Sequence, residues 1–215
     1  MFNATQIDKD PRLVIIGATQ KGKTTLASYL LRYYVKNFRI VIIDTKNDYL
    51  DVPILKLTDF KTRSFVRRVN QIENFGDEGR DIGFVSEVIA GLLLNYQRTI
   101  LYIEEVPLAI PKHAELYRSF PNIATTLCQG ASTYNGIIVV GQAIADINST
   151  FFKQSSNVYV FHVKPLERDL VEQSVGFKID WDSMADYEFW SMKNNRIYNK
   201  IPKRNSSGII EEEEK

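Results

Sequence analysis

The chain has 215 residues, a length that fits one domain and that buries roughly 70% of its unfolded surface on folding. Hydrophobic residues make up 44% and charged residues 25%, which argues against bulk disorder, and a net charge of +1 does not by itself indicate an acidic or basic partner. The single cysteine, Cys128, excludes a disulfide framework and a cysteine-based zinc site, and two histidines are too few for a metal site of the usual kind.

The compartment follows from the same data. A lone cysteine suits a reducing environment. The first eleven residues lack the apolar stretch of a secretory signal, and no apolar run approaches the roughly 20 residues that span a bilayer. We therefore expect a soluble intracellular protein with no transmembrane segment.

The first half of the chain alternates short apolar runs with helical patterns. Residues 13–16 (LVII) and 39–44 (RIVIID) each predict a strand buried on both faces. Residues 23–36 carry apolar side chains at helical spacing, and residues 58–75 predict a second helix. Residues 76–83 are rich in glycine and charge and predict a loop.

The second half continues this alternation. Residues 84–96 predict a helix, residues 99–103 a third buried strand, and one or two helices then reach about Tyr134. Residues 136–141 (GIIVVG) and 158–163 predict the fourth and fifth strands. Strands that alternate with helices and are apolar on both faces predict an α/β fold, with a mostly parallel central sheet and helices on both faces.

The C-terminal part changes character. Residues 189–192 and 196–201 flank a Lys-Asn-Asn turn and predict a small β-hairpin. Residues 205–215 are polar and acidic and predict a disordered tail. We therefore expect a single domain over residues 1–204, followed by this tail.

The segment GATQKGKT at residues 17–24 matches the phosphate-binding pattern G-x-x-x-x-G-K-[ST] without departure, between a predicted strand and a predicted helix. Glycines let backbone N–H groups surround phosphate oxygens at a helix N-terminus. Lys23 would reach the β- and γ-phosphates of ATP, and the Thr24 hydroxyl would bind Mg²⁺. The residues expected at the nucleotide are Gly17, Ala18, Thr19, Gln20, Lys21, Gly22, Lys23, Thr24 and Thr25.

Two acidic residues end the third predicted strand, in the sequence ILYIEE. Adjacent carboxylates at a dry strand end are costly unless a positive group lies beside them, and ligands bind at the carboxyl ends of such strands. Glu104 would hold the metal ion, and Glu105 would orient and deprotonate the attacking water. Gln142, just past the fourth strand, could bind both the γ-phosphate and that water. Asp44, at the end of the second strand, is expected to cap a turn.

These residues together resemble the FtsK/HerA superfamily of DNA-pumping ATPases, over roughly residues 12–170. The resemblance lies in the order of GATQKGKT, VIIDTKNDY, ILYIEE (the Walker B strand), NGIIVVGQAIADI and SSNVYVFHV. The compact chain is similar to the genome-packaging ATPases of double-jelly-roll viruses, most closely those of archaeal turreted icosahedral viruses. The resemblance implies a RecA-like fold in which the sensor strand that ends at Gln142 lies between the Walker A and Walker B strands.

The sequence departs from the superfamily pattern at two places. Glu104 stands where an aspartate is usual, so direct and water-mediated contact with the metal are both open. The segment at residues 125–134 lacks the arginine that superfamily members tend to carry there. If an arginine finger acts in trans, Arg80 and Arg118 are the candidates.

Basic residues that could contact DNA fall in three places. One group lies on the predicted helix at residues 58–75 and another near the C-terminus, and a loop before Tyr134 could face the channel of a ring. Ordinary solvated surface is the alternative for each. The candidates are Lys61, Arg63, Arg67, Arg68, Lys112, His113, Arg118, Lys200, Lys203 and Arg204.

The resemblance implies a DNA-translocating ATPase that packages a viral genome into a preformed capsid. It would act as a homohexameric or homopentameric ring on double-stranded DNA, with capsid proteins as further partners, in the host cytoplasm at assembling virions. An ATPase of the same superfamily that drives secretion or conjugation is one alternative. A small P-loop kinase is another, although the sequence lacks an arginine-rich lid, and a slow nucleotide-binding switch is a third.

Overall fold

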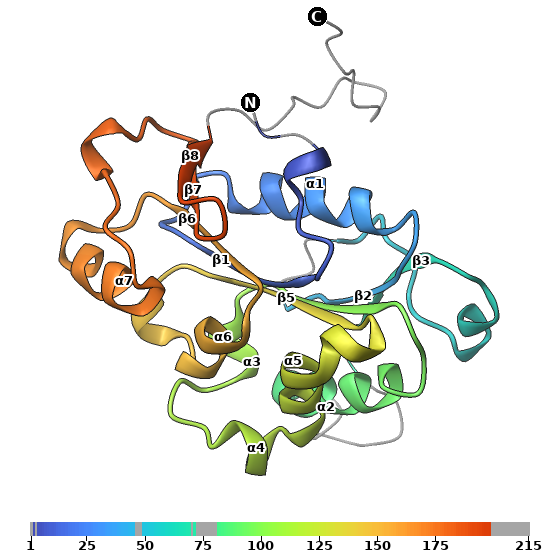
Figure 1. Ribbon diagram of the computed structural model, residues 1–215. Coiled ribbons are helices and arrows are strands. Elements are labelled where there is room, and N and C mark those ends of the chain that lie inside the picture. The colour runs from blue at the N-terminus through green and yellow to red at the C-terminus, as the bar shows by residue number, and fades with distance from the viewer. Residues whose placement is uncertain (1, 3, 46–48, 70, 72–80, 199–215) are drawn as a thin grey trace, which may run out of the picture.

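An eight-stranded sheet runs through the centre of the molecule in the computed structural model, which describes residues 2, 4–45, 49–69, 71 and 81–198 (Figure 1). The strand order is β3-β2-β4-β5-β1-β6-β7-β8, with β1 to β6 parallel and β7 and β8 antiparallel. The strands are β1 (Arg12–Ile16), β2 (Arg39–Ile43), β3 (Phe65–Val69), β4 (Thr99–Ile103), β5 (Gly136–Gly141), β6 (Asn157–Phe161), β7 (Phe189–Ser191) and β8 (Arg196–Tyr198).

The position of β5 between β4 and β1 is the strand order that the resemblance implies. Ile16 at the end of β1 pairs with Gly141 of β5, and Ile103 at the end of β4 pairs with Val139. The carboxyl ends of these three strands therefore meet at one edge of the sheet. The predicted α/β fold class and the C-terminal hairpin are confirmed.

Helices cover both faces because side chains alternate along each buried strand. Leu13 and Ile15 pack with α1 on one face, whereas Val14 and Ile16 join the core formed with α2, α5, α6 and α7 on the other (Figure 1). The helices are α1 (Lys23–Tyr34), α2 (Ile82–Leu93), α3 (Val106–Ala109), α4 (Leu116–Ser119), α5 (Pro121–Thr133), α6 (Ser149–Gln154) and α7 (Arg168–Val175).

Short 3-10 helices connect these elements. They are η1 (Ala4–Gln6), η2 (Leu57–Lys61), η4 (Ile144–Asp146), η5 (Pro165–Glu167) and η6 (Trp181–Ser183). Among the described residues, none of the helices has the length and apolar character needed to cross a membrane.

The helix predicted over residues 58–75 is wrong. The chain there forms η2 and then β3, which pairs in parallel with β2 along its whole length. Phe65 and Val69 are buried, and Phe60 packs on Phe65. The apolar side chains whose spacing suggested a helix therefore cover the outer part of the sheet instead. Pairing with the open edge of β2 outweighs the local helical pattern. Residues 72–80, which include most of the predicted loop at 76–83, lie outside the described part of the chain.

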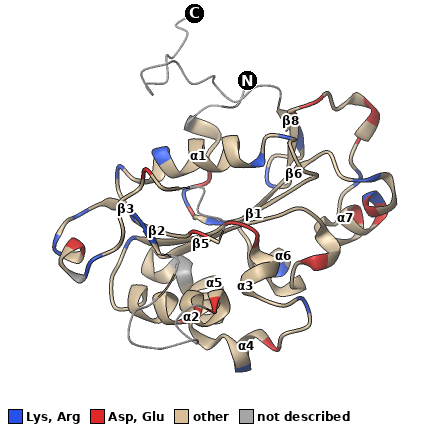
Figure 2. Ribbon diagram, turned by 180° about the vertical axis from the view of Figure 1, so that it is seen from behind, with Lys and Arg blue, Asp and Glu red and all other residues tan. Residues whose placement is uncertain are grey.

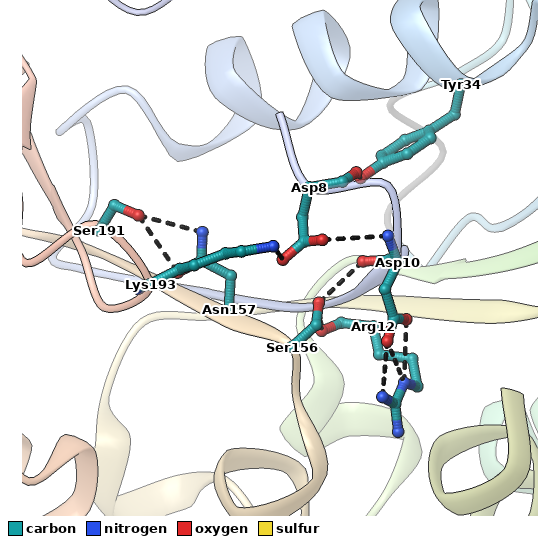
Figure 3. A network of polar contacts seen from close by, with 8 residues as sticks. All are labelled: Asp8, Asp10, Arg12, Tyr34, Ser156, Asn157, Ser191 and Lys193. Atoms are coloured by element: carbon teal, nitrogen blue, oxygen red, sulfur yellow. Dashed lines mark hydrogen bonds and ion pairs between the residues drawn. The ribbon is translucent and has the colours of Figure 1, made fainter. Parts of the chain in front are cut away.

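The C-terminal hairpin is fastened to the sheet by a network of polar contacts from the N-terminal segment (Figure 3). Asp8 is buried, and its carboxylate accepts from Lys193 Nζ at 2.8 Å. Asn157 donates to Ser191 Oγ at 3.0 Å and accepts from the backbone N–H of Lys193 at 2.9 Å. The hydroxyl of Tyr34 on α1 donates to the backbone carbonyl of Asp8. The hairpin is therefore held in a fixed position beside β6.

Candidate nucleotide-binding and catalytic site

The loop between β1 and α1 is shaped by two glycines and backed by β6. Gly17 (φ 153°) and Gly22 (φ 101°) have positive φ values that side chains disfavour. A Cβ atom on Gly17 would lie 2.5 Å from the Cβ of Phe161, so a larger residue would push β6 aside. The backbone N–H of Ala18 donates to the carbonyl of His162 at 2.7 Å. These contacts fix the loop as a cradle at the amino end of α1.

Lys23 spans the inside of this cradle. Its side chain is buried, with the residue 8% exposed, and Nζ donates to the carbonyl of Ala18 at 2.9 Å. The ammonium group and the amino end of α1 thus provide positive charge at the same place. Such a combination of lysine, helix N-terminus and glycine-rich backbone binds phosphate groups.

Glu104 follows β4 directly and is 8% exposed. Its carboxylate is shared between two sides of the site. Thr24 donates its hydroxyl to Oε1 at 3.0 Å, while the hydroxyls of Tyr49 and Tyr102 lie 2.6 Å and 3.3 Å from Oε2. Burial raises the pKa of both tyrosines, so each keeps its proton and can donate. Donors on both oxygens offset the cost of burying this carboxylate.

Glu105 lies at a sharp turn between β4 and α3, with a left-handed backbone (φ 54°, ψ 57°). Its Oε1 accepts from Gln142 Nε2 at 2.7 Å. Gln142 Oε1 in turn accepts from the hydroxyl of Thr19 at 2.9 Å. A continuous chain of side-chain hydrogen bonds therefore joins the phosphate-binding loop, the end of β5 and the end of β4.

A pocket of about 270 Å³ opens over the start of α1. Asp186, in the segment before β7, accepts from Lys21 Nζ at 2.5 Å, and this hydrogen bond lowers the pKa of the Asp186 carboxyl. The segment therefore lies against the phosphate-binding loop. The pocket is lined by Gln20, Gly22, Lys23, Thr24, Thr25 and Tyr187.

The donor set fits a nucleotide with its magnesium ion. Glycine at position 17 lets the loop backbone pack directly against β6, because a Cβ there would collide with Phe161. Thr24 Oγ1 and Glu104 Oε1 are two hard oxygen ligands 3.0 Å apart. Within the described residues no cluster of three His, Cys, Asp or Glu side chains is present. Mg²⁺ needs none, because it usually binds one or two protein oxygens together with substrate phosphates and water.

Arg118 and Lys112, the candidates of the loop region, lie away from this cradle. They line a second pocket of about 450 Å³ together with His113, at α4 and the loop before it. The Arg118 side chain is 85% exposed and lies 3.9 Å from Glu115, a surface pair of little energetic value. Neither residue is part of the phosphate site of its own chain.

The other basic candidates are dispersed. Arg67 is on β3 and is paired with Asp59 at 2.8 Å, and Arg68 lies 3.6 Å from the buried Asp44, so the two do not form a basic helix face with the exposed Arg63. Asp44 also accepts from the backbone N–H of Tyr49 at 3.3 Å, in keeping with the expected turn-capping role. Arg80, Lys200, Lys203, Arg204 and the tail at 205–215 lie outside the described residues.

Sequence reasoning missed the two tyrosines at Glu104 and the aromatic ring beside Gly22. Tyr102 was accessible to inference, since it lies two residues before Glu104 and side chains at that spacing share a strand face. Tyr49 follows β2, which is the neighbour of β4 in the sheet. It is far from Glu104 along the chain, so the sequence alone does not indicate that the two side chains meet. Tyr187 is separated from the loop by more than 150 residues, and only folding brings it there.

Comparison with known proteins places this geometry in context. No family model and no curated protein matches the chain. The genome-packaging NTPase of Sulfolobus turreted icosahedral virus 2, solved with ATP-gammaS, matches with a TM-score of 0.66 and 17% identity, over 89% of this chain and 97% of that one. The DNA-packaging ATPase of Sulfolobus turreted icosahedral virus gives 0.62 and 17%, over 88% and 97%.

A bacterial protein shares the same core. EssC (ATPases 2 and 3) from Geobacillus thermodenitrificans matches with a TM-score of 0.54 and 13% identity, over 87% of this chain and 38% of that one. Identities this low establish the fold alone. The fold that the resemblance implies is thereby confirmed, and it is the fold of these ATPases.

Proposed function

We propose that this protein is an ATP-hydrolysing motor that translocates double-stranded DNA and packages a viral genome into a preformed capsid. The observation that carries the hydrolytic part is the hydrogen-bonded chain from Thr19 through Gln142 to Glu105. It links a phosphate-binding loop to a carboxylate suited to activate water. The DNA-directed part is supported by the similarity in fold to two viral packaging enzymes.

Each residue of the site has a role that follows from its contacts. Lys23 would neutralise charge on the β- and γ-phosphates from inside the loop. Thr24 and Glu104 would hold Mg²⁺ through their paired oxygens. When bound, the metal ion supplies electrostatic stabilisation of the phosphate oxygens. Glu105 would take the proton of the attacking water, and Gln142 would orient that water and sense the γ-phosphate.

The backbone at Glu105 supports a catalytic role. A left-handed conformation costs a non-glycine residue roughly 1–2 kcal/mol, and such strain is concentrated at functional sites. Here it turns the chain from β4 into α3, with the Glu105 carboxylate 2.7 Å from the amide of Gln142. An amide that contacts both the loop and the base can report the state of the nucleotide to β5.

The assembly part of the proposal comes from the resemblance. Residues 1–204 would form one ATPase domain with a separate acidic tail at 205–215. The domain would assemble as a homohexameric or homopentameric ring around DNA, beside capsid proteins of assembling virions in the host cytoplasm. Arg118, on the exposed α4, would act in trans as an arginine finger or contact DNA, together with Lys112 and Arg63. Arg67 is a weaker DNA candidate because Asp59 already pairs with it.

A second candidate function is the movement of protein substrates in secretion. The similarity in fold to EssC favours it, since 87% of this chain matches part of that protein. Both candidates share the same chemistry, and they differ in what stimulates turnover. DNA should accelerate ATP hydrolysis by a packaging motor and leave a secretion ATPase unaffected.

The experiment that tests the proposal is steady-state ATP hydrolysis with and without double-stranded DNA, for the wild type and Glu105→Gln. The variant keeps the size of the side chain and removes the base, so we expect ATP binding to persist while turnover falls by roughly 10²-fold or more. Glu167→Gln makes the same chemical change on η5 and should leave turnover unchanged.

Each outcome points to a different conclusion. Turnover that DNA stimulates and that Glu105→Gln abolishes supports the DNA motor. Hydrolysis that depends on Glu105 but ignores DNA moves the secretion role ahead. Turnover that survives Glu105→Gln would mean that another group activates the water.

A further inference from the structure

We propose that Tyr187 is the surface on which the base of the bound nucleotide stacks, so that the segment at residues 185–188 forms the nucleoside half of the site. The proposal rests on the proposed function, because it assigns the part of the nucleotide that the phosphate-binding loop does not hold. Tyr187 is far from this loop in sequence and belongs to none of the motifs described above.

The position of the ring is the first observation. A Cβ atom on Gly22 would lie 3.5 Å from Cδ1 of Tyr187, so the ring lies directly beside the start of α1. Tyr187 lines the same 270 Å³ pocket as Lys23, Thr24 and Thr25. A triphosphate held by the loop must continue outward past these residues. The pocket at the phosphate-binding loop therefore reaches as far as the Tyr187 ring, on the side where the sugar and base would follow.

The exposure of the ring is the second observation. Tyr187 is 63% exposed although it adjoins a buried core, so much of its side chain is accessible to a ligand. Every nucleobase has a π-face, and stacking on an aromatic side chain contributes to binding whatever the base. A flat, accessible ring next to a phosphate cradle thus has the chemistry required to bind a nucleoside.

The anchoring of the segment is the third observation. Asp186 is tied to Lys21 of the phosphate-binding loop at 2.5 Å. The backbone N–H of Ala185 donates to Glu188 Oε2 at 2.8 Å, and the N–H of Glu188 donates to the carbonyl of Ala185 at 3.1 Å. This closed turn holds Tyr187 at φ 66°, a left-handed value uncommon for an aromatic residue. The backbone that carries the ring is therefore held beside the loop before any ligand binds.

The hairpin extends this anchoring to the rest of the domain. Tyr187 leads into β7, where Phe189 pairs with Phe161, the same β6 residue that backs Gly17. The turn of the hairpin is tied to the N-terminal segment through Lys193 and Asp8 (Figure 3). The phosphate-binding loop packs against β6, and the strand that follows Tyr187 pairs with β6. Both parts of the site are therefore held against the same strand.

The test compares two ligands that differ in the nucleoside alone. Binding of a non-hydrolysable ATP analogue and of inorganic tripolyphosphate is measured by calorimetry with Mg²⁺, for the wild type, Tyr187→Ala and Tyr187→Trp. We expect Tyr187→Ala to weaken analogue binding roughly tenfold and to leave tripolyphosphate binding unchanged. Tyr187→Trp should bind the analogue at least as tightly as the wild type.

Tyr134→Ala is the matched control. Tyr134 is 62% exposed and also has a positive φ, 56°. It precedes β5 and so lies at the amino ends of the strands, whereas the phosphate-binding loop lies at their carboxyl ends. Its removal should change neither affinity. Equal effects of Tyr187→Ala on both ligands, or no effect on either, would overturn the proposal.

Lys23→Ala separates this inference from the proposed function. Loss of both ligands in Lys23→Ala, with Tyr187→Ala indistinguishable from the wild type, would reject the stacking role and retain the phosphate site. Analogue binding that survives Lys23→Ala would instead reject the proposed function itself.

Discussion

The two carboxylate oxygens of Glu104 have different hydrogen-bond partners, so they can have different roles. Oε2 lies against the hydroxyls of Tyr49 and Tyr102, whereas Oε1 faces the Thr24 hydroxyl. The longer side chain of glutamate, compared with the aspartate usual at this position, is thereby fixed in one orientation. Oε1, beside the Thr24 hydroxyl, is the oxygen that would hold a metal ion together with Thr24.

Tyr49→Phe should weaken magnesium-dependent binding. The variant removes one hydroxyl donor from Glu104 Oε2 and lets the carboxylate rotate, and a hydrogen bond to a charged group contributes roughly 1.5–3 kcal/mol. We expect the Mg²⁺ concentration for half-maximal hydrolysis to rise about tenfold. In calorimetry, the analogue should lose affinity with Mg²⁺ present and bind as the wild type does in EDTA.

Tyr33→Phe on α1 is the control for this change, because it also removes one tyrosine hydroxyl but lies outside the site. An unchanged Mg²⁺ dependence in Tyr49→Phe would mean that Tyr102 and Thr24 suffice to orient Glu104.

At the scale of elements, α7 is joined to the segment that leads to the hairpin through one buried carboxylate. Glu172 accepts from Lys178 Nζ at 2.6 Å, from Trp181 Nε1 at 2.9 Å and from the backbone N–H of Ile179 at 3.1 Å. The hydrogen bond from Lys178, followed by that from Ile179, lowers the pKa of Glu172 below its usual value of 4.5. Stability in this region therefore depends on the ionised form.

Glu172→Gln should destabilise the protein in a pH-dependent way. Because the folded pKa is the lower one, the stabilisation is fully present above about pH 4.5 and is lost as the pH falls through the folded value. We expect a loss of about 2 kcal/mol in the free energy of unfolding at pH 7. In urea denaturation from pH 7 to pH 3, the difference from the wild type should shrink below pH 4.5.

Glu167→Gln, at the turn before α7, should unfold like the wild type across this pH range. A difference between wild type and Glu172→Gln that stays constant with pH would mean that packing, and not ionisation, stabilises the contact.

At the scale of the whole molecule, positive charge is distributed over several elements, including the region of β3 and the α4 segment (Figure 2). In the proposed ring, an interface that grips DNA or a neighbouring phosphate site would combine basic residues of several copies. Arg118 is suited to such a role, because its side chain is 85% exposed and lines a different pocket from the one at the phosphate-binding loop.

A mixing experiment tests whether Arg118 acts in trans. Arg118→Ala alone should lose roughly 10³-fold in turnover, the usual effect of removing an arginine finger. Glu105→Gln alone should also be inactive. Rings formed from a mixture of both variants contain interfaces with an intact Glu105 from one copy and an intact Arg118 from the next, so we expect hydrolysis to return.

Lys112→Ala mixed with Glu105→Gln provides the comparison, since Lys112 lines the same pocket as Arg118. Full turnover by Arg118→Ala on its own, or no recovery in the mixture, would exclude a trans-acting role for this residue.

Local sequence determined the parts of the site whose residues are neighbours along the chain. The glycine and lysine spacing of residues 17–24 identifies the loop, because positive φ values and a helix start are local properties. The apolar runs of β1, β2, β4, β5 and β6 indicated a buried parallel sheet, and the carboxylates after β4 indicated its functional edge.

Tertiary structure decided what depends on pairing between distant segments. Residues 58–75 carry a helical pattern, yet β3 forms because the edge of β2 offers hydrogen-bonding partners that no local pattern encodes. The placement of Tyr49 at Glu104, of Thr19 at Gln142 and of Tyr187 at Gly22 likewise arises from strand order and register. Contacts of this kind form only after the sheet has assembled, which is why the motifs identify the loop while the fold completes the site.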